Sequence, residues 1–406
     1  MQANWRTPVL LQIEPESNPT PSGAVFFAAG FRPFFLLAGV WAVVAMALWL
    51  AVWFGQAGAW PVLPPVVWHG HEMVFGFGGA AVGGFLLTAV PNWTGAAISG
   101  RPVALLTLAW AAGRLAMASG ALLPPPVIAV VDLCFLPLLA VVVGRPLIAA
   151  GKFRNMVFVV LIGVLTAANL LIHLELMGFA ATATAGLHLG IWLLLLMIAV
   201  VGGRIVPSFT KGGLRMAGIT VEPKSWPALE IAAPASLVVV AAADLAGGGA
   251  PLGIAALIAA GLHGVRLAAW YGHRTAGVPL LWILHAGYGW LVIGLALTGM
   301  AALTSVVPAN TALHALTVGA IAAMILGVMS RAALGHSGRP LVPARATVAA
   351  YALVVLAALA RAGLPLVAGF DLAVAVSGVL WIAAFGLFVM VYWPVCTGPR
   401  ADGRPG

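Results

Sequence analysis

The sequence predicts an all-α polytopic membrane protein of about twelve transmembrane helices, with both termini in the cytoplasm. Of the 406 residues, 63% are hydrophobic and only 7% are charged, too few to cover a globule that faces water. Apolar stretches long enough to cross the hydrocarbon core of a bilayer recur from about residue 33 to residue 395. Lysine and arginine concentrate in alternate loops, as expected of a multi-pass protein.

Glycine, proline and charged residues divide the apolar sequence into twelve windows, each of which predicts one helix. In order, the windows cover residues 33–54, 68–90, 103–123, 127–147, 155–177, 184–206, 228–246, 251–273, 279–302, 311–334, 343–364 and 372–395. The polar segment before them lacks the pattern of a signal peptide, so residues 1–30 are predicted to be a cytoplasmic tail. Residues 31–396 then form a single transmembrane domain, and residues 397–406 form a C-terminal tail.

The basic residues predict the orientation in the bilayer. They lie mainly in the loops that follow even-numbered helices, and Arg32, Arg400 and Arg404 flank the two ends of the domain. The positive-inside rule therefore places both termini in the cytoplasm. The net charge of +9 is scattered over short loops, so no nucleic acid partner is expected. Cys134 and Cys396 are far apart in sequence and predict no thiolate metal site.

Histidines are the candidate site residues, because an ionisable group inside a membrane is costly unless it is paired or functional. Five of the nine histidines are expected near the periplasmic ends of their helices: His69, His71, His173, His188 and His314. Imidazole binds haem iron and copper, and converging helices can supply such ligands from distant positions in the sequence. A single intramembrane histidine more often makes a hydrogen-bonded helix contact, but five at one depth favour a metal centre.

Helical spacing separates the two histidines of the second predicted helix. At about 100° per residue, His69 and His71 project about 200° apart, which predicts that they serve different centres. Glu72 shares a face with His69 and is expected to orient that imidazole, to carry protons or to lie at a helix interface. Asn169 lies on the same face of the fifth helix as His173 and points into the bundle.

Other ionisable residues have less specific interpretations. Arg114 and Asp132 lie in adjacent helices and are expected to form an ion pair, or Arg114 binds a haem propionate. Glu175 caps a helix, faces water or relays protons, whereas His285 and Tyr288 form a hydrogen-bonded pair or a proton route. A cytoplasmic cluster could bind an anion or lipid headgroups, or could be ordinary positive-inside charge: Arg204, Arg331, His336 and Arg339. No catalytic residue is identified.

Several long motifs resemble the NnrS family of bacterial membrane proteins, and the resemblance spans nearly the whole chain. The first is Trp68-His-Gly-His-Glu-Met-Val-Phe-Gly-Phe, followed by Leu87-Thr-Ala-Val-Pro-Asn-Trp-Thr-Gly95. Further matches are Gly203-Arg-Ile-Val-Pro-Ser-Phe-Thr210, Leu284-His-Ala-Gly-Tyr-Gly-Trp290, His314-Ala-Leu-Thr-Val-Gly-Ala320, Val328-Met-Ser-Arg and Leu334-Gly-His-Ser-Gly-Arg-Pro340.

The resemblance implies a cytoplasmic-membrane protein that contains haem, expected to be of b type, and copper, and that supports growth under nitrosative stress caused by nitric oxide. One assignment uses His71 and His314 as haem ligands, with His69, His173 and His188 nearer copper, although other pairings satisfy the same depths. The family is similar in cofactor content to the haem-copper oxidases. This chain lacks their adjacent histidine pair, so their oxygen-reducing site is not expected.

Three functions remain open from the sequence. The protein binds nitric oxide without turnover, or it is a nitric oxide reductase-like enzyme that takes electrons from quinol or another protein. The chain has no c-type haem motif of its own, which is why a separate electron donor is invoked. The third alternative is a proton-coupled secondary transporter, because buried histidines and carboxylates also suit proton-coupled transport.

Overall fold

The computed structural model describes residues 25–56, 62–304 and 306–404, and these residues form helices and loops without a β-strand. The predicted tail of residues 1–30 lies mostly outside the described residues. The helices are α1 (Phe31–Trp53), α2 (Pro65–His71), α3 (Gly79–Thr94), α4 (Arg101–Ala118), α5 (Pro125–Leu133), α6 (Phe135–Ala149), α7 (Val157–Leu176), α8 (Ala183–Met216), α9 (Pro227–Leu245), α10 (Gly249–Ala268), α11 (Pro279–Leu303), α12 (Ala309–His314), α13 (Ala323–His336), α14 (Arg345–Gly363) and α15 (Phe370–Thr397).

Eleven helical segments in the described part of the chain are long and apolar enough to cross a membrane. Five of them combine consecutive elements: Pro65–Thr94, Pro125–Ala149, Phe153–Leu176, Ala309–His336 and Arg345–Leu366. The 18-residue helix α4, which carries Arg101 and Arg114, is not among the eleven and completes the predicted twelve. The prediction of an all-α polytopic membrane bundle is therefore confirmed.

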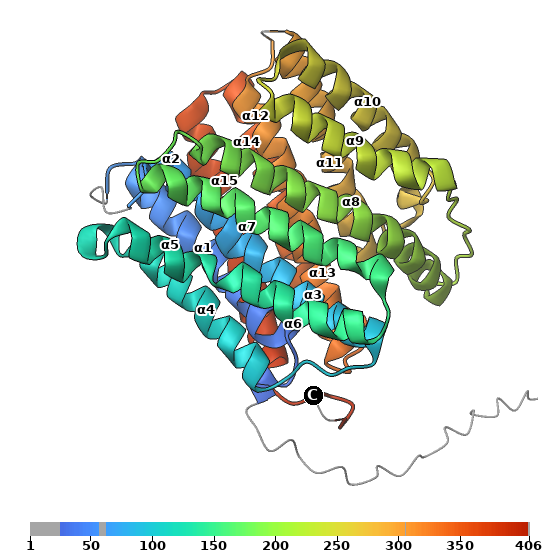
Figure 1. The fold of residues 1–406 in the computed structure, drawn as a ribbon. Coiled ribbons are helices and arrows are strands. Elements are labelled where there is room, and N and C mark those ends of the chain that lie inside the picture. Colours follow the sequence, from blue (N-terminus) through green and yellow to red (C-terminus); the bar gives the residue numbers. More distant parts are fainter. Residues whose placement is uncertain (1–24, 57–61, 305, 405–406) are drawn as a thin grey trace, which may run out of the picture.

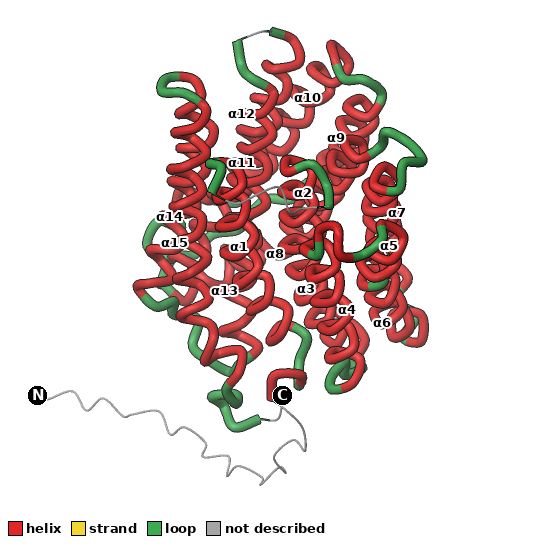
Figure 2. The backbone as a smooth tube through the Cα atoms, turned by 90° about the vertical axis from the view of Figure 1, so that its left-hand side faces the viewer, coloured by secondary structure: helices red, strands yellow, loops and turns green. Residues whose placement is uncertain are grey.

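The helices run side by side, and the two ends of the described chain meet at one end of the bundle (Figures 1 and 2). The Arg32 guanidinium at the start of α1 donates hydrogen bonds to the carbonyl oxygens of Cys396 (3.1 Å) and Gly398 (2.6 Å), beside the end of α15. Helix α1 packs against α3 and α15, whereas α9 and α10 form an outer edge beside α8 and α11 (Figure 1). With α4 counted, the chain crosses the bundle twelve times. Helices α2, α8 and α12 therefore begin at the end of the bundle opposite the two chain ends.

Two spans change from α-helix to π-helix directly after a histidine. Segment η2 (Glu72–Gly78) follows His71, and segment η6 (Ala315–Ala322) follows His314. A π-helix has a wider turn than an α-helix and occurs frequently at functional sites. The change also alters which side chains share a face, so α-helical spacing does not hold beyond either histidine.

Helices α7 and α8 approach closely because Gly186 has no side chain. A Cβ atom at this position would lie 2.5 Å from the carbonyl oxygen of Ala168 and 2.9 Å from Cγ1 of Ile172. Since backbone cannot move aside easily, only glycine allows this packing. The contact matters for the site, because α7 carries His173 and α8 carries His188.

We predict that Gly186→Ala pushes α7 and α8 apart and destabilises the protein by about 1–3 kcal/mol, the usual cost of overpacking. Thermal unfolding in detergent should show a lower Tm than the wild type. The matched control is Gly163→Ala on α7, where an added Cβ would meet no atom within 4 Å. Equal Tm values for the two variants would contradict the packing argument.

Candidate functional site

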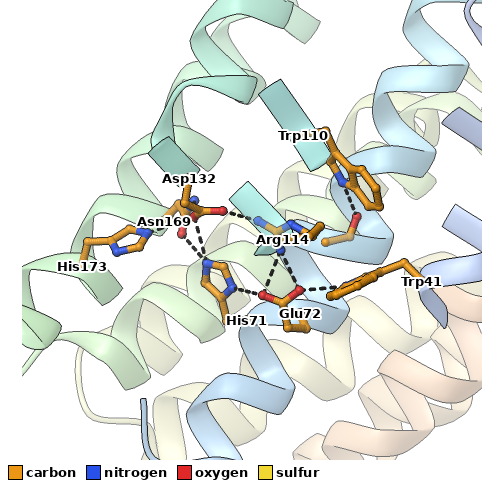
Figure 3. A network of polar contacts seen from close by, with 9 residues as sticks. Trp41, His71, Glu72, Trp110, Arg114, Asp132, Asn169 and His173 are labelled. Atoms are coloured by element: carbon orange, nitrogen blue, oxygen red, sulfur yellow. Dashed lines mark hydrogen bonds and ion pairs between the residues drawn. The ribbon is translucent and has the colours of Figure 1, made fainter. Parts of the chain in front are cut away.

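A buried polar network lies where α2 and η2 meet α4, α5 and α7 (Figure 3). Its charged and polar side chains come from segments far apart in the sequence. The labelled members are Trp41, His71, Glu72, Trp110, Arg114, Asp132, Asn169 and His173. Such a network inside a membrane is stable only when its charges are neutralised and its hydrogen-bonding groups are paired.

Arg114 connects the two carboxylates of the network. Its Nη1 donates to both carboxylate oxygens of Glu72, at 3.0 and 2.9 Å, and its Nη2 donates to Oδ1 of Asp132. The predicted ion pair between Arg114 and Asp132 is therefore confirmed, and Glu72 is a second partner. Gly76 leaves room for this arrangement, since a Cβ there would lie 2.9 Å from Nη1 of Arg114 and 2.5 Å from Nε1 of Trp41.

His71 lies between the same two carboxylates. Its Nδ1 is 2.9 Å from Oε1 of Glu72, and its Nε2 is 3.2 Å from Oδ2 of Asp132 and 2.9 Å from Oδ1 of Asn169. Ionised carboxylates only accept hydrogen bonds, so both ring nitrogens donate and His71 is an imidazolium. The two cations, Arg114 and His71, then balance the two anions.

His173 completes the network on α7. Its Nε2 is 2.9 Å from Oδ2 of Asp132, whereas its Nδ1 is buried and has no hydrogen-bond partner among the described residues. Asn169 donates to the same Asp132 oxygen at 2.8 Å. His71, Asp132 and His173 each offer one ligand atom, and these atoms lie within 4.8 Å of one another. Two imidazoles and a carboxylate form a donor set that suits copper or zinc.

The remaining three histidines of the predicted layer line a separate cavity of about 340 Å³. His69 comes from α2, His188 from α8 and His314 from α12. Most of the other lining side chains are apolar, including three indoles, those of Trp49, Trp53 and Trp381. A cavity of this size with few polar groups is typical of a site for an organic ligand or cofactor.

Two of these imidazoles are fixed by hydrogen bonds through Nδ1. Nδ1 of His188 donates to Oδ2 of Asp244 at 2.8 Å, and Nε1 of Trp192 donates to the same oxygen at 2.7 Å. Nδ1 of His314 donates to the carbonyl oxygen of Asn310 at 2.8 Å. When each ring is neutral, Nδ1 carries the hydrogen and Nε2 has a free lone pair. Metal-binding histidines are commonly oriented in this way.

His69 is positioned by stacking instead of by a hydrogen bond. Its ring lies 4.4 Å from that of Trp49 at an interplanar angle of 16°, and its Nδ1 is buried without a partner in the described part of the chain. Arg361 also lines the cavity, donates to Oδ1 of Asn310 at 2.7 Å and stacks on Phe370. Its Nη1 is buried and likewise has no partner among the described residues.

The structure corrects the predicted pairing of His71 with His314. His71 belongs to the polar network, whereas His314 lines the cavity with His69 and His188. Glu72 contacts His71 and Arg114 and not His69, whose ring stacks on that of Trp49. The separation of His69 from His71 into different centres agrees with the structure.

Arg114 and Glu175 each adopt one of their predicted alternatives. Both terminal nitrogens of Arg114 bind carboxylates, and the arginine that lines the cavity is Arg361. Glu175 accepts a hydrogen bond from the backbone N–H of Ala183 at 2.7 Å, which caps the first turn of α8. The predicted proton relay through Glu175 is not needed to explain its position.

The predicted pair of His285 and Tyr288 does not form. Nε2 of His285 is 2.9 Å from Oγ1 of Thr210 on α8, whereas the Tyr288 hydroxyl is 2.7 Å from Nδ1 of His263 on α10. The two side chains share a face of α11 but contact different neighbouring helices. Tyr288 also accepts a hydrogen bond from Arg266 at 2.9 Å.

Members of the cytoplasmic cluster pack against different aromatic rings. The Arg331 guanidinium lies 3.5 Å from the ring centroid of Phe209, while the His336 ring packs 6.0 Å from that of Phe31.

The sequence did not identify Asp244 and Arg361 as candidate site residues. Both could have been suspected, because each is an ionisable residue near the end of a predicted helix: Asp244 in 228–246 and Arg361 in 343–364.

Comparison with protein families supports the same assignment as the sequence motifs. The model of the NnrS protein family matches residues 25–400, which include the network and the cavity. The chain is a member of the NnrS family. No curated protein matches it. Family membership and the membrane-length helices together describe a multi-pass membrane protein of the NnrS type.

We predict that Arg114→Met destabilises this NnrS protein by about 3–5 kcal/mol, because it leaves two buried carboxylates with insufficient positive charge. Arg101→Met on the same helix is the control, since Arg101 is exposed. Adding Glu72→Gln to Arg114→Met should recover part of the lost Tm in detergent. If Arg114→Met unfolds at the same temperature as Arg101→Met, the network is not required for stability.

Proposed function

We propose that this protein is a haem- and copper-containing protein of the bacterial cytoplasmic membrane that binds nitric oxide and protects the cell against nitrosative stress. The observation that carries the proposal is the convergence of three imidazoles from α2, α8 and α12 on one largely apolar cavity. The family supplies the expectation of haem and copper, and these side chains supply a chemical fit. Haem iron, when bound, provides the atom that coordinates nitric oxide.

The cavity has the features that a haem requires. Its apolar walls suit a macrocycle, and His69, His188 and His314 are the candidate iron ligands. The hydrogen bond from His188 to Asp244 fixes the ring and increases the basicity of Nε2. The unpartnered Nη1 of Arg361 is suited to a carboxylate such as a haem propionate.

The polar network supplies a candidate copper site at His71, Asp132 and His173. A monovalent copper ion that replaces the proton on Nε2 of His71 leaves the net charge of the buried network unchanged. Glu72 would then accept a hydrogen bond from Nδ1 of the ligating histidine, an arrangement common at metal sites. Charge conservation matters here because an uncompensated charge in a membrane interior is costly.

We predict that purified protein has a Soret band and that its intensity per protein falls in at least one of His69→Ala, His188→Ala and His314→Ala. His273→Ala, in an exposed loop, should retain the band. Asp244→Ala should weaken haem binding by about 10- to 100-fold, because it removes the acceptor that orients His188. A wild-type protein without a Soret band would refute the haem proposal and favour proton-coupled transport.

Copper binding should depend on the polar network of His71, Asp132 and His173. We expect His173→Ala to lose copper, measured by elemental analysis, and to keep its Soret band, whereas His188→Ala should keep copper. Retention of copper in His173→Ala would exclude the polar network as the copper site.

Consumption of nitric oxide with a quinol as electron donor would identify the protein as a reductase, and stoichiometric binding without consumption would identify a scavenger.

A further inference from the structure

A second, smaller hollow adjoins the histidine cavity. It has a volume of about 80 Å³ and lies among α1, α3, α7, α8, η6 and α13. All the residues that line it are apolar or glycine. Leu194 and Ile321 line both this hollow and the histidine cavity, so these two side chains form the partition between them.

The hollow extends towards the outside of the bundle. Several of its lining side chains are only half-buried, including Val82 and Phe85 on α3, Val201 on α8 and Ile325 on α13. These residues lie within membrane-spanning segments, where the surroundings are hydrocarbon. The small hollow therefore lies between the region occupied by lipid and the histidine cavity.

Size and polarity restrict the occupant. Pockets for organic ligands typically measure about 300–1,000 Å³, so a volume of 80 Å³ is too small for a quinone or another organic cofactor. Water is disfavoured because it needs polar partners, and apolar cavities in proteins stay dry and bind apolar atoms such as xenon. A small uncharged gas molecule satisfies both restrictions.

We propose that the small hollow is a binding and entry site for an apolar diatomic gas, which passes from the bilayer past Leu194 and Ile321 into the histidine cavity. The identity of the gas as nitric oxide rests on the proposed function, whereas the site itself rests on the hollow. Apolar solutes are transferred favourably from water into hydrocarbon, so the bilayer concentrates such a gas at this entrance.

The partition is suited to transient opening. Ile321 belongs to η6, and Leu194 packs against η2, where a Cβ at Gly78 would lie 2.8 Å from Cδ1 of Leu194. The separation between the two spaces therefore consists of side chains and not of backbone. Side chains in close-packed interiors still change rotamers, which allows a small molecule to pass without unfolding a helix.

Xenon provides a direct test on the full-length protein. Crystals pressurised with xenon should show the atom in the hollow of the wild type, whereas Val201→Phe should exclude it by filling the space. Val200→Phe is the matched control, because Val200 is adjacent on α8 and does not line the hollow. Absence of xenon from the wild type, or an acyl chain in its place, would overturn the proposal.

Ligand kinetics test passage into the cavity. In the haem-loaded protein, Val201→Phe should slow both association and dissociation of carbon monoxide by about tenfold, the effect of about 1.4 kcal/mol of added barrier. The dissociation constant should remain unchanged, because a barrier on the route does not alter binding at the iron. Unchanged rates in Val201→Phe, or equal slowing in Val200→Phe, would overturn the route.

Different results would refute the proposed haem function and the proposed gas site. Xenon binding requires no haem, so a protein that takes up xenon but has no Soret band refutes the proposed function and supports the gas site. A protein with a Soret band whose hollow takes up no xenon refutes the gas site alone.

Discussion

Charge balance in a medium of low dielectric constant determines how the helices from α2 to α7 are positioned. Arg114 reaches Glu72 and Asp132 from a third helix, and His71 supplies the second positive charge. Because none of these groups can be left unpaired without a large cost, the network fixes the positions of four helices relative to one another. It also fixes α2, and with it the direction in which His69 points into the neighbouring cavity.

The network and the cavity hold their histidines differently. His71 makes hydrogen bonds through both ring nitrogens, whereas His188 and His314 each make one, through Nδ1, to another described residue. Together with Asp132 and His173, His71 could hold a metal ion in the network. Both groups lie at the end of the bundle opposite the chain termini, and π-helical segments follow His71 and His314 directly.

The sequence was sufficient for the fold because a bilayer imposes the length and polarity of each span. It also predicted the ion pair of Arg114 with Asp132, since opposite charges in adjacent helices have few other partners in lipid. The division of the histidines was predictable only in part. His69 and His71 separate as α-helical geometry requires, but the contacts of Glu72 with His71 and Arg114 depend on neighbouring side chains that no spacing rule revealed. The roles of Asp244 and Arg361 could not be predicted, because they depend on which helices, distant in sequence, the fold brings to the cavity.

The short helix α2 links the two groups mechanically. Gly70 alone separates His69 from His71, so a rotation of α2 displaces both imidazoles at once, in different directions. A ligand that moves one ring therefore changes the free energy of binding at the other, and thermodynamic linkage makes this effect reciprocal. Two ligands bound on either side of α2 would consequently show cooperativity, positive or negative, instead of independent affinities.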